Sequence, residues 1–280
     1  MDEKTALKKK EKLYKALREL PSLIVAFSGG VDSTFLLAAS FEVLGRNVTA
    51  VTARSIIHPE KDMEGARAFT DELGLEHVFI KTDEIEQPEF YSNPPDRCYH
   101  CKKKLCKKIR ETAMERGIGH IAHAVNTDDL GDYRPGIRAA REMGLIAPLV
   151  DAGLNKEEIR YLSRTMNLKT WNNQSMACLA SRIPYGDRIT EEKIRMIAGA
   201  EKLLFEDGFC RYRVRHHGTV ARIEVGKDDI GRFMDKSFRD KYVTGLRKLG
   251  FRHVSLDLEG FISGSMNRDI EELPENDNEL

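Results

Sequence analysis

The sequence contains no apolar run long enough to cross a membrane, and its first twelve residues are charged rather than apolar like a signal segment. It also lacks an excess of either charge. Because 45 Lys and Arg residues balance 45 Asp and Glu residues, no overall positive field attracts a polyanion such as tRNA. Internal repeats and low-complexity tracts are absent as well. These absences favour a cytoplasmic globular protein without a membrane or nucleic-acid partner.

Cysteine is scarce, with five residues in 280. In a reducing compartment, such a set points to metal or sulfur chemistry rather than to disulfides. Cys98 and Cys101 form a CxxC pair at the start of a predicted helix, where the helix N-terminus and the following lysines should favour thiolates. The sequence has no second CxxC and no CxxH, which argues against a four-cysteine zinc ribbon.

The best third ligand for a metal centre is Cys178, which lies in a polar, turn-rich stretch before Ile183–Gly186. Three thiolates on a cubane iron–sulfur cluster would leave one iron open to a hydrosulfide. Two alternatives stay open: an inert CxxC pair with a structural Cys178, or Cys106 as the third ligand, although Cys106 also suits a buried helix face. Cys210, at the start of a predicted strand, is expected in the core.

The strongest positive signal is the segment Ser28–Ser33, SGGVDS, between the apolar runs Leu23–Phe27 and Thr34–Ala39. This pattern predicts a strand, a phosphate-binding turn and a helix. Two adjacent glycines let the backbone curl so that amide N–H groups and the helix N-terminus converge on one anion. The segment lacks the lysine of a Walker loop and the third glycine of a dinucleotide fingerprint. A glycine-rich turn without a ligand is the alternative.

The remaining patterning predicts two domains. Up to about residue 170, short β-branched runs alternate with amphipathic helical segments, which predicts an α/β domain with a doubly wound parallel sheet. Its strands are expected at 23–27, 47–53, 77–81 and 120–125, and Asn155 caps a later helix. After residue 186 the pattern changes to α+β, with a helix over 190–206 and strands over 210–216, 219–225 and 253–258. We therefore predict domains at 1–186 and 187–270 and a frayed acidic tail at 271–280.

Several segments together resemble a known family. SGGVDS resembles the PP-loop of the ATP pyrophosphatases, and four further segments resemble the LarE family, the ATP-dependent sulfur transferases that prepare the nickel-pincer nucleotide cofactor of lactate racemase. These four segments are Asn126–Gly136, Ala177–Gly186, Arg213–Gly218 and Asp257–Gly260. The resemblance covers nearly the whole chain. It implies an adenine nucleotide alpha hydrolase-like fold, a homo-oligomer, and the adenylation of a carboxylate of pyridinium-3,5-dicarboxylate mononucleotide, which is then converted to a thiocarboxylate.

The resemblance also assigns roles to residues. PP-loop residues hold the pyrophosphate of ATP, and Asp32 helps to place Mg²⁺; these residues are Ser28, Gly29, Gly30, Asp32 and Ser33. Some family members bind a [4Fe-4S] cluster through a CxxC pair and one further cysteine, and transfer sulfur from sulfide or another donor. Cys98, Cys101 and Cys178 place this chain with that kind, with Cys178 as a catalytic residue. The alternative is that Cys178 gives up its own sulfur and becomes dehydroalanine.

Charged residues near these motifs are further candidates for cofactor binding. Asp129 and Arg134, with Asp132 between them, follow a predicted strand, where open α/β sheets bind ligands. A capped turn is their alternative role. Ser181 and Arg182 closely follow the third cysteine and are predicted to grip a phosphate, with Arg182 in the catalytic set. The alternative for this pair is a structural salt bridge.

In the second domain, Arg211, Arg213 and Arg215 alternate along a predicted strand, so their guanidinium groups would share a face suited to a nucleotide phosphate. A solvated strand surface is the alternative. Glu224, on the next strand, is predicted to pair with this arginine row or to position a metal or phosphate at a subunit interface. Trp171 is predicted to stack on a pyridinium or adenine ring, or to be a buried anchor.

Three other functions stay open on the sequence alone. A tRNA thiolase would use the same loop and cysteines and is favoured by the lysine-rich helix after Cys101, but zinc knuckles and an RNA-binding module are missing and the net charge is zero. An amidotransferase-like ligase would leave the cysteines without a purpose. A non-catalytic metal-binding or assembly protein would not need an intact SGGVDS segment.

Overall fold

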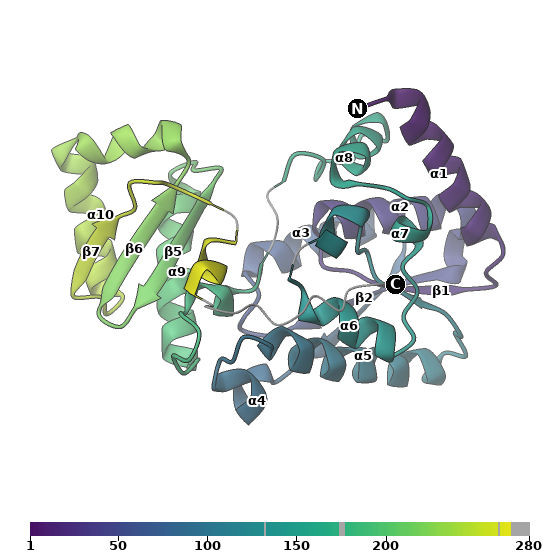
Figure 1. Cartoon of the computed structure of the whole chain (residues 1–280), viewed down its shortest axis with the longest axis horizontal. Helices are drawn as coiled ribbons and strands as arrows, with labels where there is room; N and C mark the ends of the chain where they lie inside the picture. The colour runs from purple at the N-terminus through teal and green to yellow at the C-terminus, as the bar shows by residue number, and fades with distance from the viewer. Residues whose placement is uncertain (132, 174–176, 263, 270–280) are drawn as a thin grey trace.

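Two β-sheets form the framework of the molecule (Figure 1). The computed structural model describes residues 1–131, 133–173, 177–262 and 264–269, so the predicted acidic tail and Asp132 lie outside the described residues. The first sheet is parallel with strand order β3-β2-β1-β4, and the second has the order β5-β6-β7. The strands of the first sheet are β1 (Leu23–Ala26), β2 (Val48–Arg54), β3 (Glu76–Lys81) and β4 (Ile121–Ala122).

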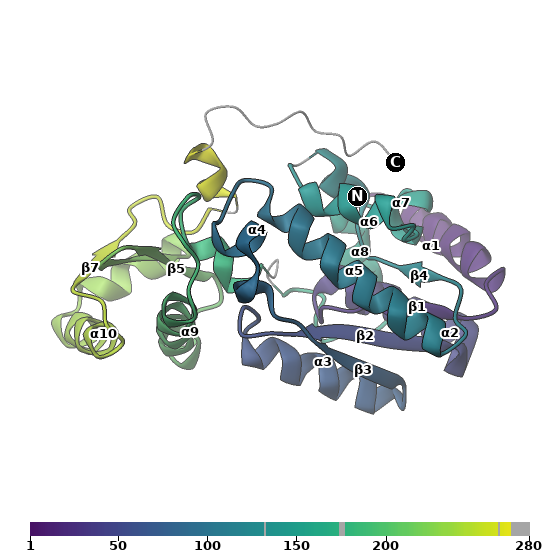
Figure 2. The same cartoon turned by 90° about the horizontal axis from the view of Figure 1, so that it is seen from below.

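Helices cover both faces of the first sheet, as a doubly wound arrangement requires. One face packs against α1 (Glu3–Arg18), α2 (Val31–Leu44), α3 (Glu60–Leu73) and α8 (Lys156–Thr165). The other face packs against α5 (Arg97–Glu115) and α6 (Pro135–Glu142). Figure 2 shows α3 and α5 on opposite sides of the sheet. Within the described residues, no helix is long and apolar enough to cross a membrane.

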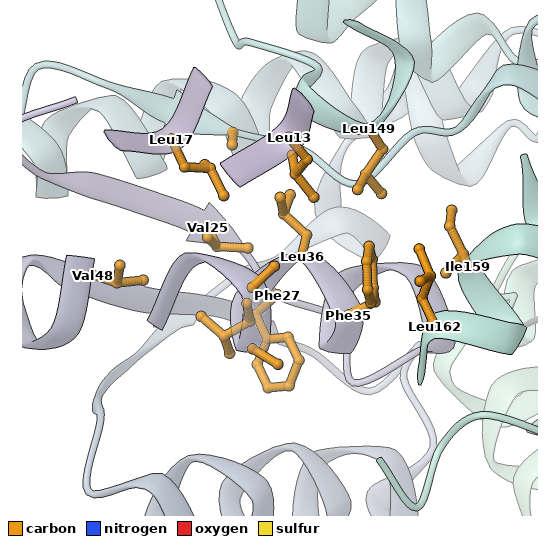
Figure 3. Packing of buried hydrophobic residues seen from close by; sticks show 14 of the residues in the cluster. Leu13, Leu17, Val25, Phe27, Phe35, Leu36, Val48, Leu149, Ile159 and Leu162 are labelled. Atoms are coloured by element: carbon orange, nitrogen blue, oxygen red, sulfur yellow. The ribbon is translucent and has the colours of Figure 1, made fainter. Parts of the chain in front are cut away.

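Strand β1 is buried on both faces, and this fixes the start of the PP-loop. Leu23 and Val25 pack into the cluster of α1, α2 and α8 (Figure 3), whereas Ile24 points to the cluster of α5 and α6. Each such side chain contributes about 1.5–3 kcal/mol through burial. The segment that follows β1 therefore leaves a rigid support at the carboxyl edge of the sheet.

Strand β4 is shorter than the sequence predicted. It ends at Ala122 rather than at residue 125, because Ala122 pairs with a single residue, Ile146, on its outer side. The amide of His123 donates to the carbonyl oxygen of Ile146 at 3.0 Å, after which the chain leaves the sheet. His123 and the residues after it are therefore free to line the carboxyl edge. Short helices α4 (Pro88–Tyr91) and α7 (Pro148–Asp151) complete this half of the chain.

The second half folds as α+β around its own core. Helices α9 (Glu191–Glu206) and α10 (Lys236–Lys248) cover one face of a sheet of β5 (Tyr212–His217), β6 (Val220–Val225) and β7 (His253–Leu256). β5 and β6 are antiparallel, and β6 and β7 are parallel. The prediction for Cys210 was wrong: β5 begins two residues later, and Cys210 is exposed rather than in the core.

A bridging segment, residues 177–190, connects the two halves and packs tightly against the first. Leu179, Ile183 and Ile189 share a buried cluster with Ile57 and Phe90 of the first half. The boundary predicted near Gly186 falls inside this segment and stays a prediction.

Asn93 holds the bridging segment by hydrogen bonds. This residue is fully buried with φ 59°, and its side-chain amide donates to the carbonyl oxygens of Ile183, Pro184 and Asp187 at 3.3, 2.6 and 3.0 Å. Its side-chain oxygen accepts from the Arg97 guanidinium at 2.6 Å. Asn93 therefore ties the start of α5 to the bridging segment.

Candidate active site

The PP-loop has the geometry of an anion cradle. Gly29 has φ +80°, and an added Cβ would lie 3.3 Å from both the Ala66 side chain and the Asp62 carbonyl oxygen, so only glycine fits without strain. Gly30 precedes α2 in extended conformation, and no side chain caps this helix N-terminus. The hydroxyls of Ser28 and Ser33 lie 3.0 Å apart and brace the turn. The first amides of α2 are therefore available to a phosphate.

Asp32 is engaged by a residue that the sequence analysis did not single out. Lys156 Nζ donates to Asp32 Oδ2 at 2.5 Å, while Asp32 Oδ1 is buried and has no hydrogen-bond partner among the residues that the structure describes. Lys156 occupies the first position of α8, where Asn155 and Glu158 form a capping box. The Asn155 cap was predicted, but nothing local indicated that α8 begins beside the PP-loop. A carboxylate held only by a lysine can exchange that cation for Mg²⁺.

A cavity of about 420 Å³ opens in front of the PP-loop. Asp32, Lys156, Cys98 and Arg134 all line this cavity. Asp129 forms an ion pair with Arg134 at 2.8 Å and accepts from the Asn126 amide at 3.1 Å. Burial raises the pKa of Asp129, and the Arg134 charge opposes this rise. Asp129 and Arg134 thus brace the turn, as in their alternative role, and both also line the cavity. Their role in cofactor binding stays a prediction.

The three predicted metal-binding cysteines lie in neighbouring positions. Cys98 and Cys101 occupy the first turn of α5, and Cys178 immediately precedes a short 3-10 helix, Leu179–Arg182. Cys101 and Cys178 pack against the same buried cluster. Cys98 opens into the PP-loop cavity, and Cys178 lines a smaller cavity of about 190 Å³ beside the end of β2. The described residues contain no group of three or more His, Cys, Asp or Glu side chains already arranged to hold a metal ion. Cys106 is buried in α5, as expected for a residue on a buried helix face.

The prediction that the helix N-terminus and lysines favour thiolates was wrong for this state. Burial raises the pKa of Cys98, and the pKa of Cys101 lies well above its usual value, chiefly through burial and then through Glu84. The lysines do not outweigh this rise: Lys104 pairs with Asp83 at 3.8 Å, and Lys102, which lines the cavity, lowers the pKa of Cys101 less than burial raises it. Bare thiolates are therefore unfavourable here, whereas a bound cationic metal centre would stabilise them.

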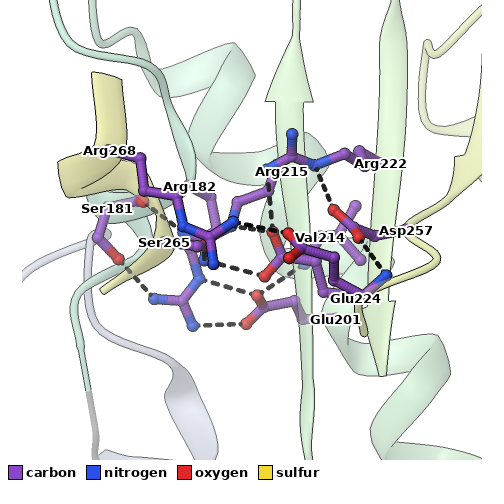
Figure 4. Close-up of polar contacts among 11 residues, drawn as sticks. Ser181, Arg182, Glu201, Val214, Arg215, Arg222, Glu224, Asp257, Ser265 and Arg268 are labelled. Carbon is purple, nitrogen blue, oxygen red and sulfur yellow. Dashed lines mark hydrogen bonds and ion pairs between the residues drawn. The ribbon is translucent and has the colours of Figure 1, made fainter. Parts of the chain in front are cut away.

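Arg182 holds the backbone around Cys178. It is 1% exposed, and its guanidinium donates to both carboxylate oxygens of Glu201 at 2.8 and 2.9 Å (Figure 4). It also donates to the carbonyl oxygens of Ala177 and Cys178 at 2.8 and 3.0 Å and to the hydroxyl of Ser181 at 2.9 Å. Burial alone would raise the pKa of Glu201, but Arg182 outweighs burial and lowers it. The contacts of Ser181 and Arg182 are therefore those of a structural salt bridge, which was the alternative role for this pair.

The arginine row of β5 is largely engaged. Arg215 is 4% exposed and donates to both oxygens of Glu224 at 2.8 and 2.9 Å, and Arg222 reaches the same carboxylate at 3.0 Å (Figure 4). Of the two roles predicted for Glu224, the pairing with arginine is the one observed. Arg213 lines a third cavity, of about 700 Å³, and burial together with Arg182 lowers its pKa to about 10.

Arg211 lines the same cavity but precedes β5, so it does not continue the strand face predicted for the row. Trp171 is 37% exposed, with the Arg164 guanidinium 5.3 Å from its ring centre, so it is not a buried anchor.

A parallel sheet that presents an SGGxDS turn at its carboxyl edge, above a cavity with an acidic residue and a lysine, defines a PP-loop protein of the ATP pyrophosphatase type. Comparisons with known proteins agree with this class. The family model for NAD synthase matches residues 6–130. The chain is 38% identical over 264 residues to pyridinium-3,5-bisthiocarboxylic acid mononucleotide synthase of Lactiplantibacillus plantarum, covering 94% of this chain and 95% of that one. It therefore belongs to the family of that synthase, the LarE family, and is an enzyme.

Two further relatives cover the chain to a similar extent. The uncharacterized protein slr1717 of Synechocystis sp. is 38% identical over 93% of this chain and 97% of its own length. The uncharacterized protein MJ0830 of Methanocaldococcus jannaschii is 26% identical over 90% of this chain and 97% of its own length. The two matches thus extend over both halves of this chain.

Proposed function

We propose that the protein is an ATP-dependent sulfur transferase that adenylates a carboxylate of pyridinium-3,5-dicarboxylate mononucleotide and converts it to a thiocarboxylate, a step in nickel-pincer nucleotide synthesis. The observation that carries this proposal is the single cavity whose walls are the PP-loop and Cys98, with Cys101 and Cys178 close by. A site that activates a carboxylate and a site that supplies sulfur are then neighbours. The name of the Lactiplantibacillus relative supports the same substrate class.

The first half of the reaction belongs to the PP-loop. A carboxylate is a poor electrophile because its leaving group would be oxide, and adenylation replaces this group with AMP. The amides at the start of α2 would bind the phosphates that leave as pyrophosphate. Asp32 would exchange Lys156 for Mg²⁺, and the released ammonium would then pair with a phosphate oxygen.

The second half belongs to the cysteines. We propose that Cys98, Cys101 and Cys178 together hold a [4Fe-4S] cluster, since three thiols of this kind provide a suitable donor set and since desolvation raises the pKa of Cys98 and of Cys101 and so disfavours their bare thiolates. When bound, the cluster would supply transferable sulfur at an iron that lacks a protein ligand. Arg182, through the carbonyl oxygens of Ala177 and Cys178, would position the third ligand.

We also propose that the protein acts as a homo-oligomer assembled through its second half. Three large apolar side chains there are exposed, namely Phe205, Met234 and Leu258 at 52, 65 and 86%. Surfaces of this kind are typical of contacts between subunits. Light scattering on the purified protein measures the assembly, and a monomer at micromolar concentration would contradict this part of the proposal.

Product mass spectrometry tests the proposed function. The protein is reconstituted anaerobically with iron and sulfide and incubated with ATP, Mg²⁺, sulfide and the mononucleotide. We expect thiocarboxylate and AMP over many turnovers, loss of product in Cys178→Ala, and full activity in the matched control Cys210→Ser, which removes an exposed thiol outside the set. Protein that stays colourless and free of iron would refute the cluster.

Two outcomes would point to other functions. A yield of one product per subunit, with Cys178 converted to dehydroalanine, would show that Cys178 gives up its own sulfur. Pyrophosphate release that requires tRNA, without any thiocarboxylate, would replace the proposed substrate with tRNA.

A further inference from the structure

His123 is a buried polar side chain that faces the active-site cavity without a partner. It follows β4 at the carboxyl edge of the sheet, and its amide is fixed by Ile146. The imidazole is 6% exposed and lines the PP-loop cavity, and its Nε2 atom is buried without a hydrogen bond to any residue that the structure describes. Leaving a buried donor or acceptor unpaired costs about 1–3 kcal/mol. Such a group at a cavity wall indicates a ligand atom that completes it.

Lys102 is a half-buried lysine that lines the same cavity as His123. It lines both the PP-loop cavity and the smaller cavity that contains Cys178, so it stands where the two meet. Within the described residues its ammonium makes no hydrogen bond or ion pair. Burial, followed by the charge of Lys102, lowers the pKa of His123 to about 3. At neutral pH the His123 imidazole is therefore neutral.

The chemistry of adenylation calls for such a pair. A substrate carboxylate and the α-phosphate of ATP are both anions, and they must come into contact between the PP-loop and the sulfur site. A cation reduces their repulsion, and a neutral N–H donor orients one carboxylate oxygen. No proton is transferred in this step, so an imidazole that stays neutral is suitable.

We propose that His123 and Lys102 form the subsite that binds the acceptor carboxylate of the substrate while its free oxygen attacks the α-phosphorus of ATP. In this step a carboxylate oxygen forms a bond to the α-phosphorus, the bond from that phosphorus to the bridging oxygen breaks, and pyrophosphate leaves with the electron pair. The subsite rests on the proposed function for the identity of the substrate, but its ligand class, a carboxylate, follows from the two side chains.

The test separates binding of the carboxylate from binding of ATP. Isothermal titration calorimetry measures the binding of pyridinium-3,5-dicarboxylate mononucleotide, of pyridine-3,5-dicarboxylate and of ATP to the wild type, His123→Leu, His123→Gln and Lys102→Met. We expect His123→Leu to weaken both carboxylates about 10-fold or more. His123→Gln, which keeps an N–H donor, should recover part of the loss, and ATP affinity should stay within about 2-fold. The matched control His253→Leu, at an exposed position of β7, should bind as the wild type does.

Each result decides one of the two proposals. Unchanged carboxylate binding in His123→Leu and Lys102→Met, in protein that still turns over the mononucleotide, would overturn the subsite and leave the proposed function intact. Loss of ATP affinity with unchanged carboxylate binding would also overturn it, because His123 would then serve the nucleotide. Binding of pyridine-3,5-dicarboxylate that depends on His123, without turnover of the mononucleotide, would support the subsite and refute the proposed substrate. If His123→Leu fails to fold, carboxylate binding by Lys102→Met decides between the same outcomes, because Lys102 is partly exposed and its replacement should leave the fold intact.

Discussion

Two charged regions of the molecule differ in how far their polar groups are satisfied. In the PP-loop cavity, Asp32 Oδ1 and His123 Nε2 have no hydrogen-bond partner in the described part of the chain. In the buried charge cluster between the bridging segment and the second sheet, Arg182 and Arg215 each bind both oxygens of a glutamate. Both regions attracted the sequence analysis because both concentrate charge near motifs. The satisfied region can hold the fold together, whereas the unsatisfied one gains energy only when a ligand arrives.

The difference also explains why the two regions adjoin. Arg182 links the two regions. Its guanidinium binds Glu201 and also donates to the carbonyl oxygens of Ala177 and Cys178. Strong ion pairs in the second half therefore fix a loop of the candidate active site in the first half. On this view Arg182 is a positioning residue, and its loss should first be seen in stability.

Removal of Arg182 should have the largest effect on stability. Arg182→Met leaves the Glu201 carboxylate buried without its counter-charge, and we expect a loss of about 3–5 kcal/mol in the free energy of unfolding, measured by urea denaturation. Adding Glu201→Leu should restore much of the loss, because the unpaired charge is then gone. If Arg182→Met alone is as stable as the wild type, the charge cluster contributes no more to the free energy of unfolding than the PP-loop cavity does.

Asp32 should behave in the opposite manner. Asp32→Asn is expected to lower ATP pyrophosphatase activity on the order of 100-fold or more, because Mg²⁺ loses a carboxylate ligand. Stability should change by less than about 1 kcal/mol, since the pair with Lys156 is partly exposed. Pyrophosphate release and urea denaturation on the same preparation measure both quantities. A large loss of stability in Asp32→Asn with unchanged activity would show that Asp32 serves the fold rather than ATP cleavage.

The sequence predicted best what depends on neighbouring residues. The PP-loop follows from an apolar strand, two glycines and an apolar helix within about 20 residues, and the structure places β1 and α2 as expected. The cap of α8 by Asn155 is also local. Cys178 was selected as the third ligand from its polar, turn-rich setting, and the family resemblance gave the same residue.

The sequence could not predict contacts that join distant segments. Lys156 reaches Asp32 across 124 positions, and Asn93 reaches Asp187 across 94. Periodicity places Arg215 and Glu224 on adjacent strands but cannot say whether the glutamate or a phosphate satisfies the arginine. The thiol pKa was misjudged for a related reason, because burial of α5 against the bridging segment is a tertiary property.

Asn93 offers a test of intermediate size at the junction of the two regions. Asn93→Asp keeps an acceptor for Arg97 and tolerates the positive φ, but it loses the amide that donates to three carbonyl oxygens. We expect a loss of about 1–3 kcal/mol in the free energy of unfolding. The matched control is Asn167→Asp, an exposed asparagine with φ 55°, which should be close to neutral. Equal effects of the two variants would show that the backbone conformation, and not the amide, matters at position 93.

The smallest effect concerns a histidine that, unlike His123, is fully partnered. His77 hydrogen bonds through Nε2 to Thr52 at 2.7 Å and through Nδ1 to Thr70 at 2.9 Å, and burial, aided by the charge of Arg67, lowers its pKa to about 4. Since an unfolded histidine has a pKa of about 6.5, the unfolded chain binds more protons between these values. The contribution of His77 to stability is therefore full above pH 6.5 and is lost as the pH falls toward 4. In His77→Gln, the free energy of unfolding should vary less steeply with pH over this window than in the wild type, while His253→Gln should keep the wild-type slope. An identical slope in His77→Gln would mean that His77 titrates alike in both states, and the contrast with His123 would then lie in hydrogen bonding alone.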